Sequence, residues 1–127
     1  MENKQYGIFI DHIKIGTTEF EKADAPMGAV FGRTKFLSLT SGYEFFKANC
    51  LKHHIPCTDH PEAKLIIIRD IPNIEIINNA GRNISGFRTE ISSTDGDYFD
   101  IGVFGISYPF YKEEFPHHVK ACHEIHF

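Results

Sequence analysis

Histidine and cysteine, two of the residue types that bind metal ions in proteins, gather in two segments of this chain. The segment CLKHHIPCTDH spans residues 50–60, and the segment FPHHVKACHEIHF spans residues 115–127. Zn²⁺ takes four nitrogen and sulfur ligands in structural sites. The two segments together could supply such a set: His54, Cys57, Cys122 and His126. Because neither a C-x-x-C pair nor an H-E-x-x-H motif is present, we predict no metal site and keep zinc as the alternative.

The same residue types could also take part in catalysis. Histidine titrates near neutral pH, which makes His12, His60 and His118 candidates for a general base. Cys57 could act as a nucleophile together with a nearby histidine and Asp59. Since no local catalytic signature surrounds any of these residues, the sequence favours a binding protein over an enzyme, and we assign no catalytic residue.

A small mixed fold must position these side chains. The chain has 127 residues, without a repeat or a linker-like segment, and this length is typical of one domain. We therefore predict a single domain over residues 1–127. Residues 6–15 carry apolar side chains on both faces and are predicted to form one strand that is covered on both sides.

The clearest helix signal begins at Ser41. Ser41 and Glu44 match the S-x-x-E capping box, which satisfies free backbone donors in the first helical turn. Tyr43, Phe46 and Cys50 then recur at helical spacing. A proline at position 56 pushes the preceding residue towards extended geometry, so the helix is predicted to span about residues 41–54.

Most of the chain beyond the helix is predicted to form strands. Four segments have strand-like composition: KLIIIRD, IEIIN, FRTEISST and DYFDIGVFGISY. The last two flank Asp95-Gly96, a strong signal for a hairpin turn. In the tail, apolar and polar residues alternate from Val119 onwards, so a terminal strand is expected there. The predicted fold is α+β, with a mainly antiparallel sheet of six or seven strands and one principal helix packed on it.

One segment near the amino terminus resembles a known family. FIDHIKIGTTEFEKA, residues 9–23, is similar to the opening strand of glyoxalase and other vicinal-oxygen-chelate proteins, over fifteen of the 127 residues. The resemblance implies that His12 is a metal ligand on the first strand. It also implies that the acidic stretch after this strand leads into a helix. The corresponding alternative function is a metal-dependent enzyme that acts on a small molecule.

Charge and composition exclude some partners. The net charge is −4 with 13 scattered basic residues, whereas proteins that bind nucleic acid normally carry a basic face. The amino-terminal segment has no apolar core of signal-peptide length, and no apolar run is long enough to span a bilayer. The three cysteines are an odd number without an export signal, which predicts reduced thiols and a cytoplasmic location.

Acidic residues close to aromatic ones suggest a surface for a protein partner. The residues predicted to bind it are Asp95, Asp97, Tyr98, Asp100, Glu113 and Glu114. Negative surfaces speed the encounter with positively charged partners, and nucleases are usually basic because they bind phosphate. We therefore expect an immunity protein or antitoxin that neutralises a basic, nuclease-type toxin by occluding its active site. An exposed sheet edge would also allow a homo-oligomer.

Overall fold

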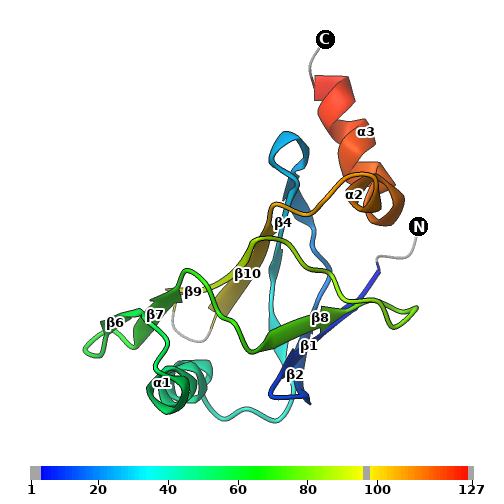
Figure 1. Ribbon diagram of the computed structural model, residues 1–127. Coiled ribbons are helices and arrows are strands. Elements are labelled where there is room, and N and C mark those ends of the chain that lie inside the picture. Colours follow the sequence, from blue (N-terminus) through cyan, green and yellow to red (C-terminus); the bar gives the residue numbers. More distant parts are fainter. Residues whose placement is uncertain (1–3, 96–97, 126–127) are drawn as a thin grey trace.

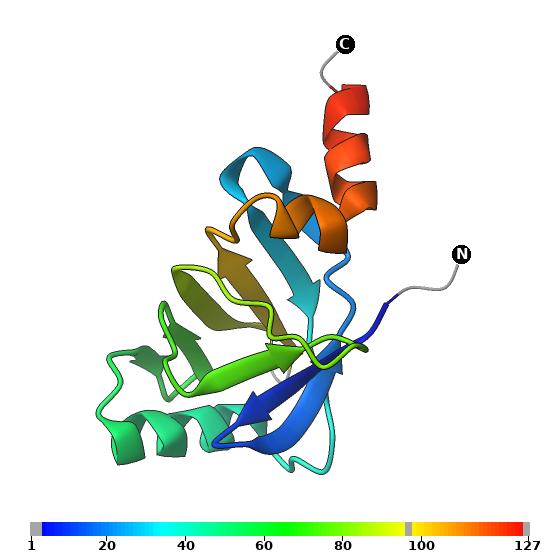
Figure 2. The ribbon, with the colours of Figure 1, turned by 45° about the vertical axis from the view of Figure 1, so that its right-hand side comes forward.

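The computed structural model describes residues 4–95 and 98–125. Within these residues the chain forms two antiparallel sheets, one of four strands and one of six, together with three α-helices. The helix α1 lies at one end of the sheets, and the helices α2 and α3 lie at the opposite end (Figures 1 and 2). The α+β class, the antiparallel pairing and the principal helix are thus confirmed.

The four-stranded sheet has the order β5-β2-β1-β8, and the six-stranded sheet has the order β3-β4-β10-β9-β7-β6. The strands of the first sheet are β1 (Tyr6–Ile10), β2 (Ile13–Thr18), β5 (Lys35–Phe36) and β8 (Ile74–Ile77). The strands of the second sheet are β3 (Lys22–Asp24), β4 (Ala29–Arg33), β6 (Thr58–His60), β7 (Leu65–Ile68), β9 (Arg88–Asp95) and β10 (Tyr98–Phe104). The sequence predicts fewer strands, because β3, β5 and β6 are too short to show an alternating pattern.

The core lies where inward-facing side chains of both sheets meet. Alternate residues of a strand point to opposite faces, and in β10 Phe99, Ile101 and Val103 are buried. Ile8 of β1 and Ile76 of β8 are opposite each other in the first sheet and join the same hydrophobic cluster. These apolar side chains therefore pack between the two sheets.

The helix α1 (Gly42–His53) begins and ends as its sequence predicts. The Ser41 hydroxyl accepts a hydrogen bond from the Glu44 backbone N–H at 3.3 Å, which is the N-cap half of the capping box. Tyr43, Phe46 and Cys50 are buried. His54 ends the helix in the left-handed conformation, with φ of 55°.

The prediction of one strand over residues 6–15 is wrong, because the chain reverses inside it. β1 and β2 form a hairpin in which Ile10 pairs with Ile13. The two turn residues, Asp11 and His12, have φ of 49° and 66°, and two-residue hairpin turns favour positive φ at both positions. The turn escapes sequence analysis because it contains neither glycine nor asparagine, although aspartate and histidine also tolerate this conformation.

The predicted terminal strand is also wrong. α2 (Phe110–Glu114) and α3 (Pro116–Ile125) occupy this part of the chain. Proline is favoured at the first position of a helix, and Val119 and Cys122 pack on the core at helical spacing. The ring of His118 is hydrogen-bonded to the Phe20 carbonyl, with a distance of 2.7 Å from its Nε2. These tertiary contacts override the alternating pattern of the tail.

The outer edge of β8 is covered by the chain that follows it. The Ile84 N–H donates to the Ile76 carbonyl at 2.7 Å, and the Asn83 side chain accepts from the Ile76 N–H at 3.2 Å. Covering an edge in this way removes backbone groups that another strand could pair with.

None of the helices in the described part of the chain has the length and apolar character needed to cross a bilayer.

Candidate functional site

The outer face of the six-stranded sheet carries a hollow at its centre. β10 turns Tyr98, Asp100 and Phe104 to this face, between its buried residues. Gly102 occupies the remaining outward position, between Asp100 and Phe104, and is opposite Phe31 of β4 and Glu90 of β9. Because glycine has no side chain, the row across the three strands has a gap at Gly102. We call this gap and its surroundings the sheet hollow.

Aromatic rings form the apolar wall of the sheet hollow. The rings of Phe31 and Phe104 meet edge to face, with their centroids 5.2 Å apart. A Cβ atom on Gly102 would lie 2.8 Å from the Phe31 ring, which is closer than van der Waals contact allows. The absence of a side chain at position 102 is therefore what lets Phe31 lean over the strand. The resulting cavity has a volume of about 510 Å³.

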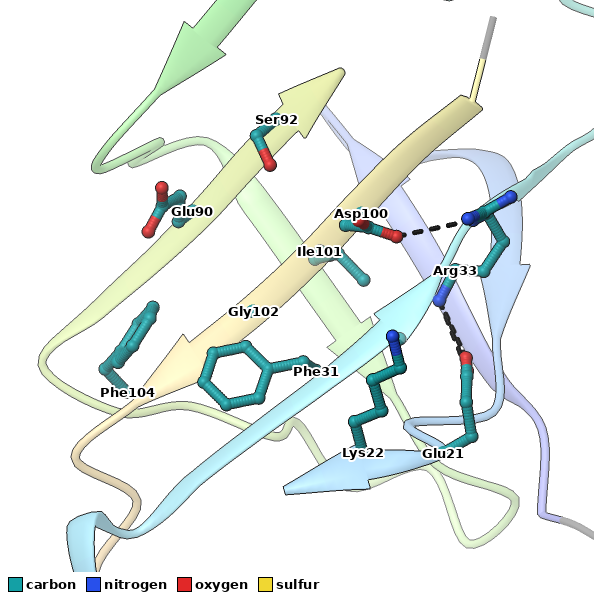
Figure 3. Close-up of a pocket in the computed structure, with 11 residues that line it drawn as sticks. Glu21, Lys22, Phe31, Arg33, Glu90, Ser92, Asp100, Ile101, Gly102 and Phe104 are labelled. Carbon is teal, nitrogen blue, oxygen red and sulfur yellow. Dashed lines mark hydrogen bonds and ion pairs between the residues drawn. The ribbon is translucent and has the colours of Figure 1, made fainter. Parts of the chain in front are cut away.

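Charged side chains surround the aromatic wall (Figure 3). The cavity is lined by the carboxylates of Glu21, Glu90 and Asp100 and by the cations of Lys22 and Arg33. The side chain of Arg33 donates to Asp100 at 3.4 Å, and its backbone N–H donates to Glu21 at 2.7 Å. The charged groups of four different strands and of the residue before β3 thus meet at one place.

Both arginines of this face lie over aromatic rings. The Arg33 guanidinium is 4.8 Å from the centre of the Tyr98 ring. The Arg88 guanidinium is 3.9 Å from the centre of the Phe104 ring and donates to Glu90 Oε2 at 3.1 Å. Stacking on an aromatic face and pairing with a carboxylate are the two contacts that guanidinium groups favour. The two arginines are therefore already partnered within the protein.

Several polar groups of the sheet hollow have no partner in the described part of the chain. Glu90 and Asp100 each use one carboxylate oxygen for an arginine, and the second oxygen of each accepts no hydrogen bond there. The side chains of Glu90 and Asp100 are only 27% and 40% exposed. Among the described residues, the Lys22 amine and the Ser92 hydroxyl of this lining have no hydrogen-bond partner either. The hollow can therefore accept an apolar group that carries hydrogen-bond donors.

The residues predicted to bind a partner are separated by the fold. Tyr98, which is 57% exposed, and Asp100 lie on the face with the sheet hollow. The backbone of Asp95 pairs with that of Tyr98, while Asp97 lies outside the described residues. Glu113 is exposed on α2, which follows the other end of β10 (Figure 1). A seven-residue strand spans about 20 Å, so these residues do not make one patch.

Glu114 is a structural residue rather than a surface one, which corrects its assignment to the partner-binding set. The residue is 8% exposed. Its carboxylate accepts hydrogen bonds from the Tyr6 hydroxyl and from the Asn78 amide, each at 2.8 Å. Burial and the nearby carboxylate raise the pKa of Tyr6, so the hydroxyl stays protonated and donates. This network joins α2 to the four-stranded sheet.

The zinc alternative that combines both histidine and cysteine segments is not supported by the fold. His54 and Cys57 follow α1, whereas Cys122 is in α3 at the opposite end of the molecule (Figure 1). His126 lies outside the described residues. Within residues 4–95 and 98–125, no group of three metal-binding side chains comes together. The terminal segment is separated from the first one because it forms a helix that docks beside β3.

The structure also departs from what the glyoxalase resemblance implies. The acidic stretch after β2 leads into β3 and a short 3₁₀ turn, and not into an α-helix. His12 is in the hairpin turn with its side chain 89% exposed, and its ring nitrogen lies 2.8 Å from Glu75. Asp59, a proposed partner of Cys57, instead accepts a hydrogen bond from the Tyr43 hydroxyl at 2.6 Å. These residues hold local structure together.

The turn residue Asp11 provides a test of one such local network. Its carboxylate accepts hydrogen bonds from the Asn73 amide and from the His53 ring, which lower its pKa below the ordinary value of 3.8. The resulting stabilisation is complete above that value and is lost as the pH falls through the lowered pKa. In Asn73→Ala, the pKa of Asp11 measured by NMR titration is expected to rise. An unchanged pKa would contradict the assignment.

The sheet hollow could be seen in the sequence only in part. Asp100, Gly102 and Phe104 alternate in DYFDIGVF and mark the outward face of one strand. The contributions of Phe31, Glu90, Lys22 and Arg33 depend on the register of β4, β9 and β3 against β10, which no local signal specifies.

The chain is thus a two-sheet α+β protein whose six-stranded sheet has a hollow on its outer face. No protein-family model matches the chain, and neither a curated protein nor a solved structure is detectably similar to it.

Proposed function

We propose that this chain is a non-catalytic binding protein that holds a basic protein against the outer face of its six-stranded sheet. In its more specific form, the proposal is that the partner is a nuclease-type toxin whose active site becomes occluded. One observation carries the proposal. The sheet hollow combines an aromatic wall with half-buried carboxylates, each of which has one oxygen that accepts no hydrogen bond from residues 4–95 and 98–125.

A lysine or arginine side chain of the partner fits this arrangement. Its aliphatic stem would lie over Gly102 against the rings of Phe31 and Phe104, and its charged group would reach the free oxygens of Glu90 and Asp100. Hydrogen bonds between ionised groups are about twice as strong as those between neutral ones. A half-buried carboxylate gains more from such a contact than a fully exposed one.

The opposite occupant, an anion held by Lys22, is less well matched. The carboxylates that line the hollow outnumber its cations by three to two. Arg33 is already engaged by Asp100 and by the Tyr98 ring. Lys22 is exposed on the edge strand β3, and its flexible stem lets the amine move into solvent. Substitution of Lys22 therefore distinguishes a cationic occupant of the sheet hollow from an anionic one.

The rest of the face has the residue types of an interface centre. Tyrosine, phenylalanine and arginine are enriched at interfaces, and tyrosine and arginine often dominate their binding energy. Tyr98, Arg33 and Arg88 lie around the sheet hollow, and Phe87 beside them is 69% exposed. Because these arginines are held by rings and carboxylates, they are preorganised and lose little freedom on binding.

The proposal is tested with a defined set of partners. A cell that makes a toxic enzyme must make its inhibitor at the same time, so the products of the genes beside this one are the proteins to purify and titrate. Complexes are detected by native mass spectrometry, and affinity is measured by calorimetry. The expected result is a one-to-one complex with a basic protein whose enzymatic activity falls in parallel with binding.

Matched variants then locate the surface. Glu90→Gln with Asp100→Asn is expected to weaken binding at least tenfold, which corresponds to about 1.4 kcal/mol. Glu62→Gln with Glu113→Gln removes the same charge elsewhere and is expected to change affinity little. Lys22→Ala is expected to tighten binding. If the acidic pair has no effect and Lys22→Ala weakens the complex, the hollow binds an anion and the proposal is wrong.

A further inference from the structure

The end of α1 brings two cysteines into the same small region. Cys50 lies in the penultimate turn of the helix and is only 4% exposed. After the helix the chain reverses through the left-handed residue His54, whose N–H donates to the Cys50 carbonyl. The Ile55 N–H donates to the same carbonyl at 2.9 Å. The residues that follow the helix are thus folded back against Cys50.

The returning segment runs antiparallel to the helix. Tyr43, Lys47 and Cys50 share one helical face, because they are spaced by four and three residues. Asp59 of β6 accepts a hydrogen bond from the Tyr43 hydroxyl at 2.6 Å and pairs with Lys47 at 3.3 Å. The return path is therefore fixed at both ends, by Ile55 beside Cys50 and by Asp59 beside Tyr43.

Cys57 lies midway along this returning segment. Alternate residues of an extended segment point the same way, and both Ile55, which is buried, and Asp59 point towards the helix. The side chain of Cys57 is therefore expected to take the same direction, towards Cys50, and the raised pKa of the Cys50 thiol, to which Cys57 contributes, agrees with this placement. Cys57 is nevertheless exposed and lines a cavity of about 500 Å³ beside Pro56 and Arg69.

We propose that Cys50 and Cys57 are an oxidisable thiol pair, which forms an intrachain disulfide when a hydroperoxide reacts with Cys57. The observation behind this proposal is the return of the chain from Ile55 to Asp59 along the helical face of Cys50, which places an accessible thiol beside a buried one. It concerns a different part of the molecule from the sheet hollow, and it stands or fails independently of the proposed function. The third cysteine, Cys122, is in α3 at the far end (Figure 1).

The reaction balances with hydrogen peroxide as the oxidant. The Cys57 thiolate attacks one peroxide oxygen, the O–O bond breaks, and the sulfur is oxidised to a sulfenic acid while water leaves. The Cys50 sulfur, as it loses its proton, then attacks the Cys57 sulfur, and the S–O bond breaks to release a second water. In total two thiols lose two electrons and two protons, and one peroxide is reduced to two waters.

The second step is expected to depend on pH. Burial, together with the neighbouring Cys57, raises the pKa of the Cys50 thiol to about 12. At neutral pH this thiol is therefore protonated, and only the thiolate is a good nucleophile. Once the Cys57 sulfenic acid has formed, the rate of disulfide closure is therefore expected to rise with pH.

Peptide mapping tests the pairing directly. The full chain is treated with a small excess of hydrogen peroxide, blocked with an alkylating agent and digested with trypsin. Cleavage after Lys47, Lys52 and Lys64 separates the two cysteines into the peptides ANCLK and HHIPCTDHPEAK. We expect these peptides to be joined by a disulfide that dithiothreitol reduces. The intact protein is expected to lose the mass of two hydrogen atoms.

Variants and stability complete the test. Cys122→Ser is expected to form the same disulfide, whereas Cys50→Ala should leave a Cys57 sulfenic acid that dimedone traps. Closing the short loop should raise the melting temperature of the oxidised wild type by several degrees, with no rise for Cys57→Ser. The proposal is overturned if Cys50 is still alkylated after peroxide treatment, or if Cys57 is found linked to Cys122 or to a second chain.

Discussion

Replacement of Phe99 by alanine is expected to lower the free energy of unfolding by about 3–5 kcal/mol, the cost of removing a large aromatic side chain from a close-packed core. Phe99 is fully buried in β10. Its ring centroid is 5.4 Å from that of Phe36 and 5.5 Å from that of Phe46. It therefore contacts both the four-stranded sheet and α1. The truncation leaves a cavity where three elements meet, which allows little relaxation.

Urea denaturation, followed by circular dichroism, measures this loss. Phe87→Ala is the matched control, because the Phe87 side chain is 69% exposed and surface changes usually stay within about 0.5 kcal/mol. A loss below about 1 kcal/mol for Phe99→Ala would mean that Phe99 does not join the helix to the sheet as described here.

Replacement of Glu114 by leucine is expected to cost about 2–4 kcal/mol of stability. The Tyr6 hydroxyl and the Asn78 amide would both lose their acceptor, and a buried donor left without a partner costs about 1–3 kcal/mol. Lys4, which lies 3.5 Å from the carboxylate, would also lose its ion pair. Leucine has nearly the same size, so the loss reports on hydrogen bonding more than on packing.

Two further variants separate this structural role from a role in partner binding. Glu114→Gln keeps one carbonyl acceptor and is expected to cost less than the leucine variant. Glu113→Leu changes the neighbouring exposed position and is expected to cost less than 0.5 kcal/mol. If Glu114→Leu left the unfolding transition unchanged, the carboxylate would not be holding α2 against the sheet.

The parts of the fold that the sequence predicts are those with strong local signals. The N-cap at Ser41 and the proline at position 56 delimit α1. β9, which ends at Asp95, pairs with β10, which begins at Tyr98, while Gly96 of the predicted turn lies outside the described residues. The hairpin at Asp11 and His12 has no such signal, because neither turn residue is the glycine or asparagine that marks a two-residue turn. The helix α3 depends on docking contacts of His118 and Val119 with distant residues.

In the candidate site too, the sequence predicts only those residues that have a local signal. Tyr98 and Asp100 could be selected because they alternate with buried residues on one predicted strand. Its charge makes Glu114 a candidate as well, but the sequence alone cannot distinguish a buried carboxylate that accepts two hydrogen bonds from an exposed one. The sheet hollow itself arises from the absence of a side chain at Gly102 beside Phe31. Such a gap exists only once the register of two strands is known.

The pairing of distant strands has a consequence for how the chain folds. Gly7 of β1 pairs with Ile77 of β8, and Gly32 of β4 pairs with Ile101 of β10, so each sheet is joined across some seventy positions of sequence. Proteins rich in such non-local pairings fold in milliseconds to seconds, because the chain loses the entropy of loop closure before the stabilising contacts form. During synthesis, β1 and β4 are made first and have no partner at these edges until β8 and β10 have emerged from the ribosome. In the amino-terminal part of the chain, the hairpin of β1 with β2 and the pair of β3 with β4 are local enough to form earlier.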